Sequence, residues 1–224
     1  MLQFVESQTE LTTAATDLLL GLLAVFCFLY LWHKLPEGMA KRLWLALFGF
    51  LALSSFLGAF AHAVRMEQRI NDLLWHPLYF FLGLTLTLLA LIAVLNWRGE
   101  PSASRAMRWL LPLPFVVVLV TWLGAGAFIY FVLFEAAIML FVFGVYFRLV
   151  LKQQPGSRFV LAGVVLSIVA AILQAIGPYT FQVVWQFDHN GLFHLVQLPG
   201  VVFFFFGARS SVGSVFSVSP VTPP

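Results

Sequence analysis

Ionisable side chains inside long apolar stretches are the residues of this chain that say most about chemistry. His62, Glu135 and His194 lie within such stretches, and Asp188 and His189 stand where the last stretch begins. Because an ionisable group in lipid is costly, each of them is a candidate for function. Imidazoles and carboxylates gathered in one layer are what a metal site or a proton-transfer site requires.

Helical spacing places these candidates at similar depth from one end of the protein. At 1.5 Å per helical residue, His194 lies about 10 Å below the start of its stretch, and Glu135 lies roughly 12 Å from the same end. His62 comes near the end of a stretch that runs the opposite way. The structural alternatives are that His194 makes an interhelical hydrogen bond and that Glu135 is a neutral carboxyl bonded to a neighbouring helix.

The spacing at the start of the last stretch limits which residues can act together. His189 and His194 do not share a helix face, so His189 can join His194 at one metal only from the helix cap or the preceding turn. Asp188 or Asn190 is the expected N-cap of this helix. Asp17 is interpreted as an acid at the start of the first helix, where the helix dipole favours it.

Seven apolar stretches must position these side chains. Only 9% of the 224 residues are charged and 62% are hydrophobic, and the mean hydropathy is +0.98, which excludes an ordinary soluble domain. Each stretch is long enough, or nearly so, to cross a bilayer as a helix. The stretches are 13–33, 43–64, 73–95, 108–124, 127–151, 158–178 and 186–208. We therefore expect an all-α polytopic membrane protein, with one seven-helix bundle over residues 1–209 and a disordered cytoplasmic tail over residues 210–224.

The cations predict how the bundle is oriented. Of the twelve Lys and Arg residues, only Arg65 and Arg69 fall in segments on the side of the N-terminus. The other ten are Lys34, Lys41, Arg42, Arg98, Arg105, Arg108, Arg148, Lys152, Arg158 and Arg209. By the positive-inside rule the N-terminus is outside and the C-terminus inside, with residues 98–108 as the longest cytoplasmic loop. We expect an integral protein of a bacterial inner membrane, with membrane lipids as its partners. The net charge of +3 comes without a dense basic run and does not indicate nucleic-acid binding.

The layout resembles the seven-helix CREST superfamily, which includes alkaline ceramidases and the progestin and adipoQ receptors. The resemblance is carried by the segment from Ser54 to His62 and by the segment from His189 to His194. The chain is also similar to small bacterial membrane proteins with a His-Asn-x-x-x-His pattern at the start of the last helix. The superfamily resemblance implies a zinc ion that activates water, with His62 and His194 as ligands. Gly58 stands where the superfamily has a serine.

The third zinc ligand stays open between four residues, because Asn190 stands where the superfamily has a histidine. His189 is the leading candidate, and the alternatives are His76, Asp188 and Glu135.

The leading functional hypothesis is a zinc-dependent hydrolase that acts on a lipid amide or ester at the outer side of the membrane. Zinc would polarise the carbonyl and activate water, and Glu135 or Asp188 would accept the proton of that water. The first alternative is a non-enzymatic lipid-binding or receptor-like membrane protein with the same histidine-containing pocket. A second alternative is a redox protein in which two histidines ligate haem.

Overall fold

The computed structural model describes residues 3–124 and 129–213. Within these ranges the chain forms eight helices. They are α1 (Gln8–Lys34), α2 (Met39–Ala63), α3 (Gln68–Arg98), α4 (Glu100–Leu110), α5 (Leu113–Leu123), α6 (Ile129–Leu151), α7 (Ser157–Ala175) and α8 (His189–Gly213). Seven helical stretches are long and apolar enough to cross a membrane, with α4 and α5 together forming the fourth. The prediction of an all-helical bundle with seven helices of membrane-spanning length is confirmed.

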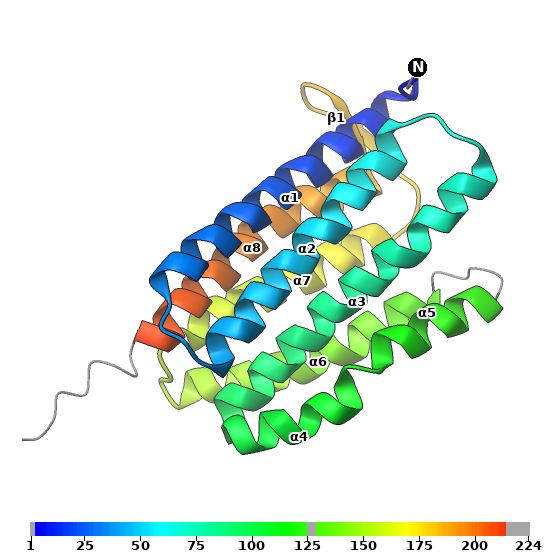
Figure 1. Ribbon diagram of the computed structural model, residues 1–224. Coiled ribbons are helices and arrows are strands. Elements are labelled where there is room, and N and C mark those ends of the chain that lie inside the picture. The colour runs from blue at the N-terminus through cyan, green and yellow to red at the C-terminus, as the bar shows by residue number, and fades with distance from the viewer. Residues whose placement is uncertain (1–2, 125–128, 214–224) are drawn as a thin grey trace, which may run out of the picture.

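Six of the helices form a closed ring. Going round it, α1 packs on α2, α2 on α3, α3 on α6, α6 on α7, α7 on α8, and α8 returns to α1. Figure 1 shows α1, α2 and α3 as the near layer and α8, α7 and α6 behind them. Helices α4 and α5 lie outside the ring against α3, and α5 also touches α6. The ring therefore has an interior that six different helices can line.

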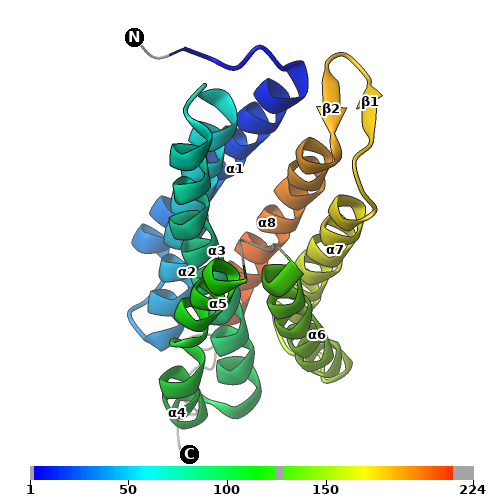
Figure 2. The same ribbon diagram turned by 90° about the vertical axis from the view of Figure 1, so that its right-hand side faces the viewer.

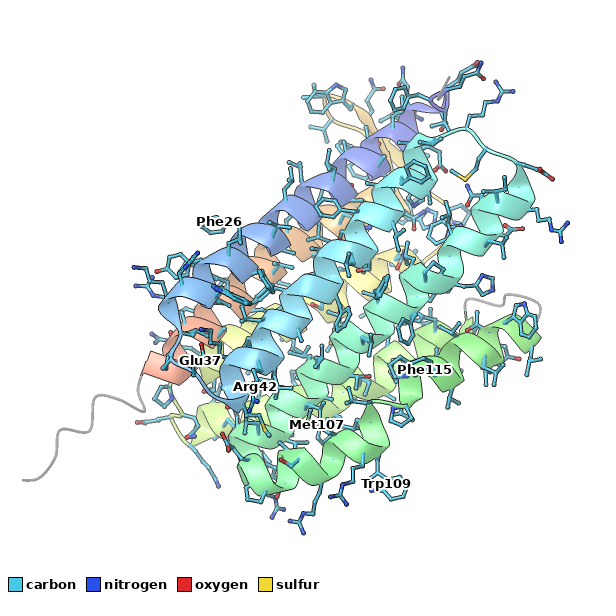
Figure 3. The ribbon with its side chains drawn as sticks, viewed as in Figure 1. Phe26, Glu37, Arg42, Met107, Trp109 and Phe115 are labelled. Carbon is cyan, nitrogen blue, oxygen red and sulfur yellow. The ribbon has the colours of Figure 1, made fainter. Side chains whose placement is uncertain are left out.

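Apolar side chains cover the outer surface of the ring as well as its core. Phe26 of α1 and Phe115 of α5, both labelled in Figure 3, are 58% and 63% exposed. Glu37 and Arg42 lie at the end where α1 leads into α2 (Figure 3). A surface that is apolar along the helices and charged at their ends fits a protein embedded in lipid.

Close approach of α7 and α8 depends on small residues. A Cβ on Gly163 would lie 2.7 Å from Cε1 of Phe204 and 3.0 Å from the carbonyl oxygen of Gly200. A Cβ on Gly207 would collide with Cγ2 of Val160. Small residues let helices in lipid come near enough for extensive van der Waals contact, which is a main source of their association.

The fourth span differs from the prediction. The expected cytoplasmic loop at residues 98–108 is helical from Glu100, with Pro101 in the first turn of α4, where proline is tolerated. The expected single helix at residues 108–124 is instead divided between Leu111 and Pro112, and α5 starts at Leu113. Proline lacks a backbone N–H and clashes with the preceding turn, which explains why the helix breaks there.

A β-hairpin connects the last two spans. Strand β1 (Thr180–Gln182) pairs antiparallel with β2 (Gln186–Asp188), with Thr180 opposite Asp188. The hydroxyl of Thr12 on α1 donates a hydrogen bond to the carbonyl of Gln186 over 2.7 Å. Figure 2 shows the hairpin at the same end of the bundle as the start of α1. This end is called the hairpin end below.

The first and last helices of the chain are longer than predicted. Helix α1 starts at Gln8 rather than near residue 13, and the hydroxyl of Ser7 caps it by accepting from the backbone N–H of Glu10. Helix α8 continues to Gly213, past the expected end of the bundle at residue 209. The rest of the predicted disordered tail, residues 214–224, lies outside the described residues.

Candidate functional site

A cavity of about 260 Å³ lies inside the ring and is lined by all six of its helices. Its apolar wall comes mainly from leucine and phenylalanine side chains. These are Leu20, Leu47, Leu51, Leu78, Leu82, Leu86, Leu89, Phe131, Met139, Phe193 and Phe204. Its polar groups are concentrated toward the hairpin end. Along α2, for example, the lining changes from Leu47 and Leu51 to Ser54, Ser55 and finally His62.

Three of the five predicted site residues line this cavity. His62 from α2, Glu135 from α6 and His194 from α8 all face it, as their matched depth predicted. Asp188 and His189 are not among the residues that line it. The site must therefore be rebuilt from the groups that the structure brings together.

Asp17 of α1 and His194 of α8 form a deeply buried histidine–carboxylate pair. Oδ1 of Asp17 lies 3.3 Å from Nε2 of His194, and the two residues are 6% and 8% exposed. The other nitrogen of the imidazole, Nδ1 of His194, lies 3.1 Å from the hydroxyl oxygen of Thr16, which is also on α1. Helices α1 and α8 are thus joined through both nitrogens of one imidazole.

The Thr16 hydroxyl is the partner of this imidazole on its Nδ1 side. The hydroxyl oxygen lies 2.9 Å from the carbonyl of Thr13, 3.1 Å from the carbonyl of Thr12 and 3.1 Å from Nδ1 of His194. A hydroxyl can donate to a carbonyl and accept from an imidazole N–H at the same time, so this network accommodates a proton on Nδ1.

Glu10 and His62 form a second histidine–carboxylate pair. Nδ1 of His62 lies 2.6 Å from Oε2 of Glu10, and the imidazole packs edge-on against Trp75 with ring centroids 5.3 Å apart. The Nδ1–H donates to the carboxylate, which fixes the tautomer and leaves Nε2 as the basic nitrogen. Among residues 3–124 and 129–213, Nε2 has no hydrogen-bond partner. His62 lines the cavity, so this nitrogen is available to a bound molecule.

Glu135 differs from the other carboxylates of the site. Within the described part of the chain it has no ion pair and no hydrogen bond, and it lines the cavity from α6.

Two amide side chains of the lining use only part of their hydrogen-bonding capacity within the protein. Nε2 of Gln174 donates to Oδ1 of Asn190 over 2.9 Å, and Nε2 of Gln197 donates to Oγ of Ser167 over 3.0 Å. Oε1 of Gln197 is buried and has no hydrogen-bond partner in the described part of the chain.

Two residues of the site, Glu10 and Asp17, were not predicted from the sequence as site residues. Asp17 was expected at the start of the first helix, but α1 starts at Gln8, so Asp17 lies deep within α1 and faces the ring. The pattern Ser7-x-x-Glu10 is typical of a helix N-terminus and could have placed the start correctly. With that start, Glu10 and Asp17 are seven residues apart, so they share one helix face.

Asp188 has a structural role at the start of α8. Its Oδ1 accepts from the backbone N–H of Gly191 over 2.8 Å and from the hydroxyl of Thr13 over 2.9 Å. The first bond is that of an N-cap, as predicted, and the second attaches α8 to α1.

The two remaining histidines of this end lie away from the cavity lining. Nδ1 of His189 is buried and has no hydrogen-bond partner among the residues that the structure describes, and the ring centroid of His189 is 6.3 Å from that of Tyr179. Nδ1 of His76 lies 3.0 Å from the backbone carbonyl of Asp72.

The predicted zinc ligands do not fit a metal site in this arrangement. The described residues contain no group of three or more His, Cys, Asp or Glu side chains placed to hold a metal ion. Both nitrogens of His194 have protein partners, and His189 does not reach the cavity lining. We therefore derive no chemical step through zinc.

Gly58 controls how Asp17 sits against α2. A Cβ at this position would lie 2.5 Å from Oδ2 of Asp17. We expect Gly58→Ala to turn the carboxylate away from His194 and to cost on the order of 1 kcal/mol, because the carboxylate can rotate and little else must shift. Thermal unfolding of purified protein measures the cost. Gly49→Ala is the matched control on the same helix, since its Cβ would make an ordinary 3.7 Å contact with Phe28. Equal effects of the two substitutions would contradict this role for Gly58.

A family model covers most of the chain. A model described as "Family of unknown function (DUF6962)" matches residues 12–212. No curated protein and no solved structure matches the chain. The matched range contains every residue that lines the cavity, whereas Glu10 lies before it.

Proposed function

The chain belongs to the DUF6962 family, whose function is unknown, and from the geometry of the cavity we propose that it binds a single-chain membrane amphiphile inside the helix ring. The observation that carries this proposal is one cavity with a leucine-lined interior and a polar end. A purely polar ligand would leave the apolar wall unused, and a pure hydrocarbon would leave Glu135 and Gln197 without partners. An amphiphile matches both parts.

The expected orientation places the polar end of the cavity at the outer side of the membrane, with the N-terminus outside. In a Cys27→Ser background, a cysteine at Val183 in the hairpin should react with an impermeant thiol reagent in intact cells. A cysteine at Ser104 of α4 should react only after permeabilisation. Val183 is 76% exposed and Ser104 is also exposed, so both are accessible to a reagent on their own side. The reverse labelling pattern would overturn the orientation.

Binding is tested by extracting bound molecules from purified protein and identifying them by mass spectrometry. Leu51 lines the cavity and is 6% exposed, so Leu51→Trp should fill the cavity and remove the bound amphiphile. Leu53→Trp is the matched control, because Leu53 lies on the same helix and is 47% exposed. Ser55→Leu is a second, smaller filling variant. Equal amounts of bound amphiphile in all folded variants would contradict binding in this cavity.

A second candidate function, hydrolysis of a bound lipid amide or ester, is favoured by the Glu10–His62 pair. A carboxylate that holds Nδ1–H and leaves Nε2 free is the arrangement of a histidine general base. Nε2 would take a proton from water as the water oxygen bonds to the carbonyl carbon. The same proton would pass to the nitrogen or oxygen that leaves, which gives an acid and an amine or alcohol.

The hydrolase candidate requires turnover of N-acyl and ester lipids by purified protein. We expect His62→Ala and Glu10→Gln to lower the rate on the order of 10²-fold or more. His76→Ala should leave the rate unchanged, because His76 does not line the cavity. If no substrate turns over, binding stands alone. Stoichiometric zinc with turnover that a chelator abolishes would instead support the zinc route predicted from the sequence.

A further inference from the structure

The polar end of the cavity contains hydrogen-bond acceptors that have no donor among the described residues. Oε1 of Gln197 is one of them, although a buried polar atom is normally hydrogen-bonded to protein or water. The Glu135 carboxyl adds two more acceptor oxygens that have no partner within the described residues. Both residues line the same cavity, so both are exposed to a molecule that binds in it.

The lining also lacks a positive charge to balance Glu135. Within residues 3–124 and 129–213, no lysine or arginine lines the cavity. Its two imidazoles each have a carboxylate partner already, His62 with Glu10 and His194 with Asp17. An anionic head group would therefore approach the unpaired carboxyl of Glu135, with no lysine or arginine of the described lining to receive it.

We infer that the amphiphile of this cavity carries a protonated amine as its head group, with Glu135 as its counter-ion and Gln197 as a second acceptor. An ammonium group offers three N–H donors and one positive charge. Its donors can bond to the unpaired acceptors of Gln197 and Glu135, and its charge can neutralise the Glu135 carboxylate. A hydroxyl offers one donor and no charge, so an alcohol of the same chain length satisfies the site less well. This inference rests on the proposed binding function and adds the chemical class of the ligand.

The experiment compares four amphiphiles that share one chain and differ in head group: decylamine, decanol, decanoate and decyl phosphate. Their dissociation constants are measured by equilibrium dialysis against purified full-length protein in nanodiscs of zwitterionic phosphatidylcholine, which have no net surface charge. Partition into the bilayer is subtracted with the cavity-filled Leu51→Trp protein. We expect decylamine to bind at least about tenfold more tightly than decanol and than either anion, the size of one charge-assisted hydrogen bond.

Substitutions then locate the preference. Glu135→Gln should remove most of the advantage of decylamine over decanol and leave decanol binding unchanged. Glu67→Gln is the matched control, because Glu67 is an exposed carboxylate at the same end that does not line the cavity. Gln197→Met is a second variant that removes the unpaired acceptor and should weaken decylamine in particular.

The outcomes separate this inference from the function on which it rests. Equal or tighter binding of decanoate or decyl phosphate overturns the amine head group, as does a preference for decylamine that survives Glu135→Gln. If none of the four amphiphiles binds the wild type more than the Leu51→Trp protein, the proposed binding function itself fails.

Discussion

Alanine in place of Asp17 is expected to lower the free energy of unfolding by about 1–3 kcal/mol, because it leaves Nε2 of the buried His194 without its partner. Asp17 lies on α1 and His194 on α8, so the loss also removes a direct tie between the first and last helices of the ring. Unfolding in increasing amounts of a denaturing detergent, followed by tryptophan fluorescence, measures the effect.

A double-mutant cycle isolates the contribution of the pair. His194→Ala alone leaves a buried carboxyl without its imidazole, whereas the double variant removes both groups. The double variant should therefore lose less stability than the sum of the two single losses, by about 0.5–3 kcal/mol. Glu6→Ala is the control for removing an acid at the same end, since its side chain is 93% exposed and the expected change is within about 0.5 kcal/mol. Additive single losses would show that Asp17 and His194 do not stabilise each other.

The gathering of His62, Glu135 and His194 could be predicted because depth in a membrane helix follows directly from sequence position. Each helix rises by a fixed amount per residue, and a buried ionisable side chain must face the interior of the bundle. These two rules place the three side chains in one layer inside the bundle, and in the structure all three line one cavity. What depth cannot supply is which side chains meet within the layer, and here the prediction of zinc ligands relied on a resemblance.

Apolar periodicity is a poor guide to helices that contain many polar residues. The start of α1 is polar, from Gln8 to Thr13, so a search for apolar residues begins too late along the helix and treats Asp17 as terminal. The amphipathic helix α4 was missed for the same reason, since Glu100, Arg105 and Arg108 interrupt any apolar run. Capping patterns mark such helix starts better than hydropathy does.

The position of His189 shows a limit of a different kind. The spacing of five residues indicates that His189 and His194 do not share a helix face. Whether the backbone before α8 turns His189 back toward the cavity depends on the hairpin that precedes this helix. Strand β2 leads directly into α8, and Asp188 caps the helix. His189 consequently starts the helix beside Tyr179, away from the lining of the cavity.

Gly207→Ala is the other substitution for which we expect a large loss of stability, about 1–3 kcal/mol. The new Cβ would collide with Cγ2 of Val160, and it would lie 3.2 Å from the backbone nitrogen of the same residue. Val160 is fully buried and its branched side chain is short, so the contact can be relieved only by moving α7 away from α8. Helix separation then also weakens the neighbouring contact of Gly163 with Phe204.

A compensating substitution distinguishes this collision from a general intolerance of alanine. Val160→Ala removes the methyl groups that collide, so the double variant Gly207→Ala with Val160→Ala should be more stable than the sum of the two single losses allows. Gly144→Ala on α6 is the control, because its Cβ would meet nothing within 4 Å. That control should be neutral or more stable by up to about 1 kcal/mol, since alanine favours helix over glycine. A Gly207→Ala protein as stable as the wild type would show that α7 and α8 do not need their close approach, and the ring that encloses the cavity would then require another explanation.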